Sequence, residues 1–128
     1  MSEPIVFISS HRIKEGKLDG FKHVSREMVP LLEAAQPHTV LFQGYLNEEA
    51  TEVTFVWVFP DADAMDLHFQ GAEERAAKAY EFIQPQRFEI YGRPSDQVLA
   101  MMRREAGTGV GLVVKPQPMG GFIHLESG

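Results

Sequence analysis

The chain has 128 residues, of which 44% are hydrophobic and 23% charged, a composition typical of one soluble globular domain. Its net charge of −6 argues against a nucleic-acid-binding protein, which needs a basic surface to neutralise phosphates. The lack of cysteine excludes disulfides, zinc–thiolate sites and iron–sulfur clusters. No apolar run reaches the roughly 20 residues that span a bilayer, and the N-terminus lacks a signal-peptide pattern. We therefore expect a soluble, cytoplasmic protein that binds neither nucleic acid nor membrane.

The N-terminal part of the chain predicts a strand followed by a helix. Residues 4–9 are β-branched and aromatic, which favours a first strand that continues towards Ile13. Residues 17–35 carry apolar side chains at steps of three, four and seven, the spacing of one helical face. Pro30 removes a backbone donor inside this helix and predicts a kink or a break there.

The middle of the chain predicts a hairpin, a second helix and a fourth strand. Residues 39–46 and 52–59 are apolar runs joined by a short polar segment, which is the pattern of a β-hairpin. Residues 61–83 have one apolar stripe at helical spacing, and residues 86–92 read as a strand. The order βαββαβ predicts an α+β, ferredoxin-like fold with an antiparallel sheet.

The C-terminal residues are less regular. We expect a ferredoxin-like domain over residues 1–94 and a C-terminal extension over 95–128, with a short helix over 95–107. The extension is too rich in apolar residues to be disordered. We expect it to pack on the same domain or on a partner subunit, with 110–114 or 121–125 adding an edge strand.

The two strands of the predicted hairpin are apolar on both faces. Along 52–59, Phe55 and Trp57 lie on one face, and Val56 and Val58 lie on the other. Two helices can cover only one face of a four-stranded sheet, and a strand buried on one side should alternate with polar residues. A second copy of the chain, packed sheet against sheet, would cover the other face. We therefore predict a homodimer.

The acidic residues and the histidines are the candidates for a metal or catalytic site. Asp61, Asp63 and Asp66 cluster where the second helix begins, and acids there are more typical of helix capping than of a metal site. The five histidines form no HxxxH or HxH pair. The sequence therefore predicts no metal site.

His68 is the residue with the strongest functional signal. On a helical wheel it lies about sixty degrees from the apolar stripe at ~100° per residue, so it can reach inward between helix and sheet. It is either a partly buried packing residue or a proton donor or ligand anchor. The second role is chemically reasonable because the ordinary pKa of a histidine side chain is near neutral. His11, at the end of the first strand, could line the mouth of the same cavity.

Residues 58–68, "VFPDADAMDLH", carry a resemblance to a known family. A strand-end aromatic (Phe59), a short acidic turn, Ala64 with a hydrophobic neighbour and then His68 resemble the antibiotic-biosynthesis monooxygenase family of dimeric α+β barrels. The resemblance covers roughly residues 4–92. Catalytic members often have a tryptophan at the position of Phe59, and an asparagine near that of His11. Here Trp57 lies two residues earlier on the same strand face.

The resemblance implies a cofactor-independent monooxygenase, without metal or flavin, for a small aromatic or quinone-like substrate. In that reading His68 transfers a proton or donates a hydrogen bond, Trp57 and Phe59 are stacking walls with Phe55 beside them, and His11 is a polar lid. The alternative is a non-catalytic dimeric barrel that binds a small apolar ligand, since the family also includes small dimers without known activity.

Overall fold

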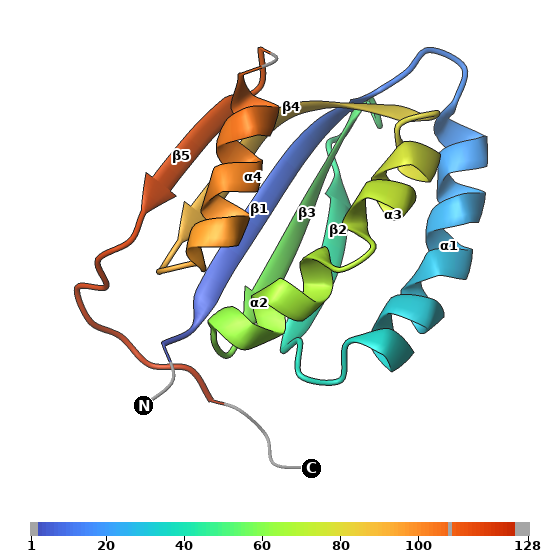
Figure 1. The fold of residues 1–128 in the computed structure, drawn as a ribbon. Coiled ribbons are helices and arrows are strands. Elements are labelled where there is room, and N and C mark those ends of the chain that lie inside the picture. Colours follow the sequence, from blue (N-terminus) through green and yellow to red (C-terminus); the bar gives the residue numbers. More distant parts are fainter. Residues whose placement is uncertain (1–2, 108, 125–128) are drawn as a thin grey trace.

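The computed structural model describes residues 3–107 and 109–124, which form one five-stranded sheet with all its helices on a single face (Figure 1). The predicted α+β, ferredoxin-like βαββαβ arrangement is confirmed, and a further helix and strand follow it. The strands lie in the order β2-β3-β1-β4-β5. In chain order the elements are β1 (Ile5–Ile13), α1 (Leu18–Ala35), β2 (Leu41–Leu46), β3 (Glu52–Phe59), α2 (Ala62–Phe69), α3 (Ala72–Ala79), β4 (Ile83–Tyr91), α4 (Asp96–Ala106) and β5 (Gly111–Lys115).

The central strand β1 organises the core. It pairs antiparallel with β3 on one side and with β4 on the other. Every second residue of β1 is buried beneath the helices, because successive side chains of a strand point to opposite faces. Five buried positions follow this period of two: Ile5, Phe7, Ser9, His11 and Ile13. Two of the five are polar, and both belong to the candidate site.

Strand β4 begins at Ile83, earlier than the predicted range 86–92. The early start was missed because a β-bulge interrupts the alternation of inward and outward side chains along the strand. Ser10 pairs with Arg87 while the next residue, His11, pairs with Pro85, so β4 holds one extra residue at this point. Such a β-bulge changes which side chains of the strand face the core. Ile83 and Phe88 are therefore both buried although they are five residues apart.

The predicted single helix over 61–83 is wrong, because the segment forms two short helices. α2 ends at Phe69 and α3 begins at Ala72, and Gly71 between them has φ of +73°. This left-handed conformation is accessible to glycine at little cost and stops the first helix. The break lets α2 and α3 take different directions across the sheet (Figure 1).

Helix α1 covers the other end of the helical face. It runs from Leu18 to Ala35 without the break expected at Pro30, which lies inside it. Phe21 is the buried residue of this helix and packs in a cluster with Ile13, Val53 and Ile83. The helix thereby closes one end of the space between helices and sheet.

Residues after Tyr91 extend the same sheet and core. β5 pairs parallel with β4 as an edge strand, as expected for 110–114, whereas residues 121–124 form no strand and residue 125 lies outside the described residues. α4 is capped by Ser95, whose hydroxyl accepts a hydrogen bond from the backbone N–H of Val98. Val98 and Met102 of α4 are buried in the main core cluster.

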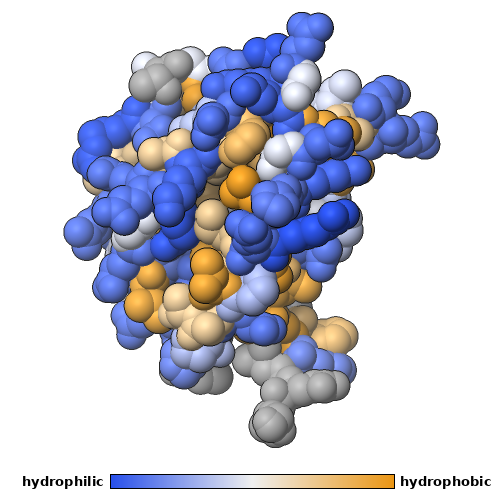
Figure 2. Space-filling model, turned by 90° about the vertical axis from the view of Figure 1, so that its right-hand side faces the viewer, coloured by the Kyte–Doolittle hydropathy of each residue, from blue (hydrophilic) through white to orange (hydrophobic). Residues whose placement is uncertain are grey.

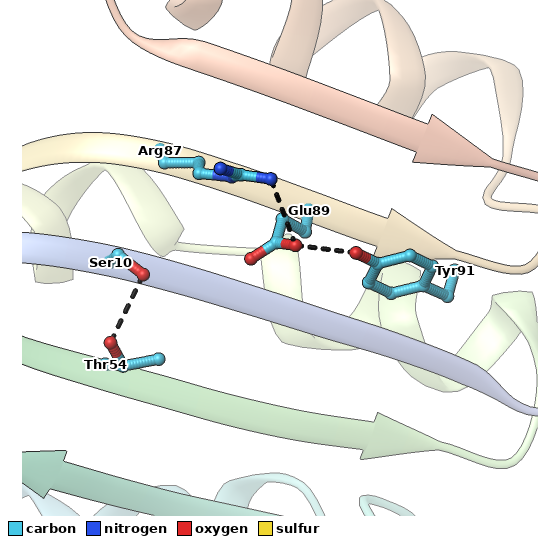
Figure 3. A network of polar contacts seen from close by, with 5 residues as sticks. All are labelled: Ser10, Thr54, Arg87, Glu89 and Tyr91. Carbon is cyan, nitrogen blue, oxygen red and sulfur yellow. Dashed lines mark hydrogen bonds and ion pairs between the residues drawn. The ribbon is translucent and has the colours of Figure 1, made fainter.

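The face of the sheet away from the helices carries a mixture of polar and apolar side chains. Figure 3 shows the polar part: the Ser10 and Thr54 hydroxyls lie 3.2 Å apart, and Glu89 accepts hydrogen bonds from Tyr91 at 2.6 Å and Arg87 at 3.5 Å. Exposed apolar side chains accompany them on the edge strand β2, namely Leu41 and Tyr45. No helix of the described residues covers this face.

Another apolar area lies where α1 meets the sheet edge. Figure 2 shows apolar surface between polar surroundings on the side of the molecule where α1 lies in Figure 1. Val29 and Leu31 of α1 and Leu46 of β2 are among the exposed apolar side chains.

In the part of the chain that the structure describes, no helix has the length and apolar character that crossing a membrane requires.

Candidate functional site

A cavity of about 190 Å³ lies between the sheet and the helices. Its floor is the helix-facing side of β1 and β3, and its walls come from α1, α2, α3 and α4. Most of its surface is aromatic or aliphatic, which favours a ligand that is largely apolar. The aromatic lining comprises Phe7, His11, Phe21, Phe42, Phe55, Trp57, His68, Phe69, Tyr80 and Phe88.

Helix α2 places His68 in this cavity. The helix begins after Asp61, whose carboxylate accepts a hydrogen bond from the backbone N–H of Ala64 at 2.9 Å, so the predicted capping role is confirmed for Asp61. His68 is 6% exposed and lies in the last turn. Its ring centroid is 4.9 Å from that of Trp57, 4.8 Å from Phe69 and 5.4 Å from Phe59.

A single hydrogen bond fixes the protonation of the His68 ring. Its Nδ1 lies 3.0 Å from the side-chain oxygen Oε1 of Gln36, a buried residue at the C-terminal end of α1. An amide oxygen only accepts hydrogen bonds, so Nδ1 carries the proton. The other ring nitrogen, Nε2, then has a free lone pair and acts as the hydrogen-bond acceptor of the ring.

His68 is neutral across the physiological pH range. Burial, and to a smaller extent the nearby positive charge of Arg75, together lower its pKa from 6.5 to about 3. The Arg75 guanidinium donates hydrogen bonds to the backbone carbonyls of Gln70, at 3.0 Å, and of His68. It therefore satisfies carbonyl groups left free at the end of α2.

A second histidine lies in the floor of the cavity. His11 is 5% exposed, and its Nε2 is 3.1 Å from the hydroxyl oxygen of Ser9, which is also buried. Burial lowers the pKa of His11 to about 4. Its Nδ1 is buried and, within the described part of the chain, has no hydrogen-bond partner. A buried polar atom without a partner is costly, and a ligand oxygen or a water would satisfy it.

The structure brings most of the predicted site residues together. His68, Trp57, Phe55 and His11 all line the one cavity. Phe59 does not line it: it is fully buried in the core and supports the His68 ring from behind. His11 is a floor residue of β1 and not a lid at the mouth.

Several lining or supporting residues were missed by the sequence analysis. Gln36, Ser9 and Tyr80 have no motif of their own, and Gln36 meets His68 across a separation of 32 residues. Tyr80 lies 6.2 Å from the His11 ring, and burial, together with the charge of Glu105, raises the pKa of its phenol. The position of Ser9 could have been predicted from the period of two in β1, because Ser9 shares the buried face of this strand with Phe7 and His11.

Asp66, like Asp61, has a structural role in the described part of the chain. The Asp66 carboxylate accepts a hydrogen bond at 2.6 Å from the Ser95 hydroxyl and thereby ties α2 to the start of α4. No three His, Asp or Glu side chains gather as a metal site among residues 3–107 and 109–124.

No protein-family profile and no curated protein sequence matches the chain, whereas solved structures match its fold. MupZ from Pseudomonas fluorescens superposes with a TM-score of 0.70 over 94% of this chain and 96% of its own, at 15% identity. SnoaB from Streptomyces nogalater, described as a cofactor-independent oxygenase, superposes with a TM-score of 0.59 over 73% of this chain and 96% of its own, also at 15% identity. A Bacteroides thetaiotaomicron protein provisionally assigned as an antibiotic biosynthesis monooxygenase has a TM-score of 0.55 over 64% of this chain and 81% of its own, at 15% identity. The chain therefore has the fold of the antibiotic-biosynthesis monooxygenase structures.

Proposed function

We propose that the protein is a cofactor-independent monooxygenase for a small, flat aromatic or quinone-like substrate. The observation that carries the proposal is the His68 ring, which is neutral, buried and oriented by Gln36 on the wall of an aromatic cavity. The fold shared with SnoaB is consistent with this chemistry. We expect the working unit to be a homodimer in the cytoplasm.

The cavity wall suits a planar ring system. Trp57 stacks on Phe7 with a centroid separation of 5.2 Å and on Phe42 at 5.0 Å. A row of rings of this kind forms an apolar surface that binds an aromatic ligand by removing apolar area from water. Excluding water also protects a reactive carbanion from protonation by solvent.

His68 supplies the proton transfer in this proposal. Its Nε2 lone pair accepts a hydrogen bond from a substrate hydroxyl or an activated C–H group, and takes the proton as negative charge develops on the substrate. The low pKa of His68 belongs to the empty cavity, where nothing compensates a positive imidazolium. A substrate anion beside the ring provides that compensation and raises the pKa.

The substrate itself reduces dioxygen. After deprotonation of an activated CH₂ group, the carbanion transfers electrons to O₂ and a C–O bond forms, giving a peroxide that takes back the proton held by His68. Loss of the remaining C–H proton and cleavage of the O–O bond release water and leave a carbonyl. The sum is CH₂ + O₂ → C=O + H₂O, and His68 returns to its neutral state.

Ser9 and His11 form another polar point of the cavity, on its sheet side. They lie two and four residues beyond Phe7 along β1, which corresponds to about 7 and 13 Å at the rise of a strand. Phe7 is the β1 residue near His68, with ring centroids 6.4 Å apart. A substrate with an oxygen function at each end would therefore engage His68 at one end and the free Nδ1 of His11 at the other.

Oxygen uptake in the presence of a panel of hydroxylated anthrones and naphthols tests the proposal. We expect uptake that depends on the protein and on one class of substrate, and a loss of at least tenfold in His68→Gln. His23→Gln is the matched control, because His23 is an exposed histidine of α1. Tight binding of these compounds without oxygen uptake would instead support the alternative, a non-catalytic ligand-binding barrel.

A further inference from the structure

Gln36 is a buried polar residue, and burying its amide side chain is unfavourable unless the amide forms hydrogen bonds. It is 6% exposed and ends α1, with its backbone N–H donating to the carbonyl of Leu32 at 2.9 Å. Its own carbonyl accepts from the backbone N–H of Thr39 at 3.1 Å, so the main chain is held on both sides. Burying a flexible amide side chain costs conformational entropy and desolvation, and only good hydrogen bonds offset these terms.

The amide oxygen of Gln36 receives two donors. His68 Nδ1 lies 3.0 Å from it and the Thr39 hydroxyl 3.3 Å from it. The amide nitrogen is buried and has no partner within the described residues, so the oxygen makes both side-chain contacts of this amide that the structure shows. The three residues come from the end of α1, from the loop after it and from α2, and the link therefore forms only in the folded chain.

In the part of the chain that the structure describes, no carboxylate is paired with the His68 ring, although Glu73 and Glu105 line the same cavity. Rings of Phe7 on β1, Trp57 and Phe59 on β3 and Phe69 on α2 pack around it, and all are neutral. The charged group that acts on it is Arg75 of α3, and its charge opposes protonation. Gln36 offers an acceptor without a charge, unlike the carboxylate that often partners a catalytic histidine.

We propose that Gln36 is the positioning residue of the site: it holds His68 as the neutral Nδ1–H tautomer, so that Nε2 is the proton acceptor for the cavity. An aspartate or glutamate in its place would favour the imidazolium, which cannot accept a proton. The tautomer is inferred from the contact between His68 Nδ1 and Gln36 Oε1 and does not depend on the proposed function. Its consequence for turnover rests on the proposed function.

Nitrogen NMR of the histidine side chains in the intact protein tests the tautomer without any variant of Gln36. Long-range proton–nitrogen correlation distinguishes a protonated ring nitrogen from an unprotonated one, and comparison with His68→Gln assigns the signals of His68. We expect a protonated Nδ1 and an unprotonated Nε2 from pH 5 to pH 8. A proton on Nε2 would mean that the amide is turned round, and would overturn the proposal.

Two substitutions test the role of the amide. Gln36→Met removes the acceptor at similar volume, and we expect the Nε2–H form of His68 to appear in the spectrum. Gln36→Glu adds a negative charge beside Nδ1, and we expect the pKa of His68 to rise by about 1–3 units. Gln97→Glu, an exposed glutamine of α4, is the matched control and should leave His68 unchanged. An unaltered tautomer in Gln36→Met together with an unaltered titration in Gln36→Glu would overturn the proposal.

Turnover separates this inference from the proposed function. If the protein is an oxygenase, Gln36→Met should lower kcat at least tenfold while KM changes less than threefold, since the cavity wall is kept. A wild-type protein with the expected tautomer but no oxygenase activity would leave the positioning role intact and remove only the proposed reaction. Full activity in a Gln36→Met variant whose His68 has lost its tautomer would overturn the link between the two.

Discussion

Two imidazoles are buried neutral in this protein, and each has one ring nitrogen held by a side chain. His68 is bound by Gln36 through Nδ1, and His11 meets Ser9 through Nε2. Their low pKa values have burial as the main cause. The energetic cost of keeping them uncharged should therefore be visible in the stability of the fold as well as in catalysis.

Stability should fall as the pH drops below 6.5. In the unfolded chain both histidines take up protons near their ordinary pKa of 6.5, whereas in the folded chain they do so only at about 4 for His11 and about 3 for His68. Between these values the unfolded state binds more protons, so acid favours unfolding, and the stability is fully present above pH 6.5. Each histidine contributes a slope that approaches about 1.4 kcal/mol per pH unit.

Urea unfolding at pH 7 and at pH 5 measures this effect. We expect the free energy of unfolding to fall less between pH 7 and pH 5 in His68→Gln than in the wild type, because the variant lacks one of the two buried histidines. His23→Gln changes an exposed position, so its free energy of unfolding should fall as much as that of the wild type. An identical pH dependence in His68→Gln and wild type would show that His68 is not held neutral by the fold.

At the scale of the elements, local chemistry explains which parts of the site could be predicted. The period of two in β1 and β3 and the helical spacing before His68 are strong signals, and they place His11, Phe55, Trp57 and His68 correctly on inward faces. Phe59 shares the face of Trp57, but it lies at the end of β3 and is fully buried, so pattern alone could not separate core from cavity.

The errors of prediction have tertiary causes. The bulge opposite Ser10 and His11 changes which side chains of β4 face the core. The first residue of this strand was therefore assigned to the predicted helix over 61–83. The apolar stripe over 61–83 continues across the break at Gly71, which depends on the backbone conformation of one glycine. Gln36 was missed because its partner His68 lies 32 residues later and is brought near only by the tertiary fold.

The break between α2 and α3 predicts a sensitive glycine. Gly71 has φ of +73°, so Gly71→Ala should destabilise the protein by about 1–2 kcal/mol through backbone strain. Gly111→Ala in β5 is the matched control, because a Cβ there meets its neighbours at ordinary distances of 3.7 Å or more. Equal melting temperatures for the two variants would contradict the strained conformation at residue 71.

The C-terminal elements should be indispensable for the fold. Truncation after Gly92 removes Val98, Met102 and Val110 from the main core cluster and uncovers Phe88 and Ile90. Loss of one such side chain typically costs 2–5 kcal/mol, so we expect an insoluble or largely unfolded product.

Truncation after Lys115 is the comparison for that experiment. It keeps α4 and β5 and removes a segment in which Met119 and Phe122 are exposed. We expect its thermal melt to stay close to that of the full chain. A soluble product of truncation after Gly92 that melts at the wild-type temperature would show that α4 and β5 do not support the core.

At the scale of the whole molecule, the face of the sheet that no described helix covers is the surface on which a second copy would pack. Its central part carries Ile8, Val56 and Val58, which are half-buried, together with the polar group of Figure 3. The homodimer predicted from the sequence would place two such faces against each other. An interface of this type should be large and apolar at its centre.

Sedimentation at micromolar concentration tests the dimer. We expect a particle of twice the 14.4 kDa chain mass. Val56→Glu should shift the equilibrium to the monomer, because it puts a charge in the centre of the proposed interface. Gln97→Glu adds the same charge on exposed α4 and should leave the dimer intact. A wild-type particle of 14.4 kDa would contradict the prediction.

The fate of isotopically labelled dioxygen tests whether the His68 cavity carries out a cofactor-independent oxygenation. With ¹⁸O₂ and the substrate that gives the fastest uptake, we expect one labelled oxygen atom in the carbonyl product and one in water. We expect His68→Gln to lose this labelled product and His23→Gln to keep it. Unlabelled product, or labelled product formed equally well by His68→Gln, would show that this cavity does not oxygenate the substrate.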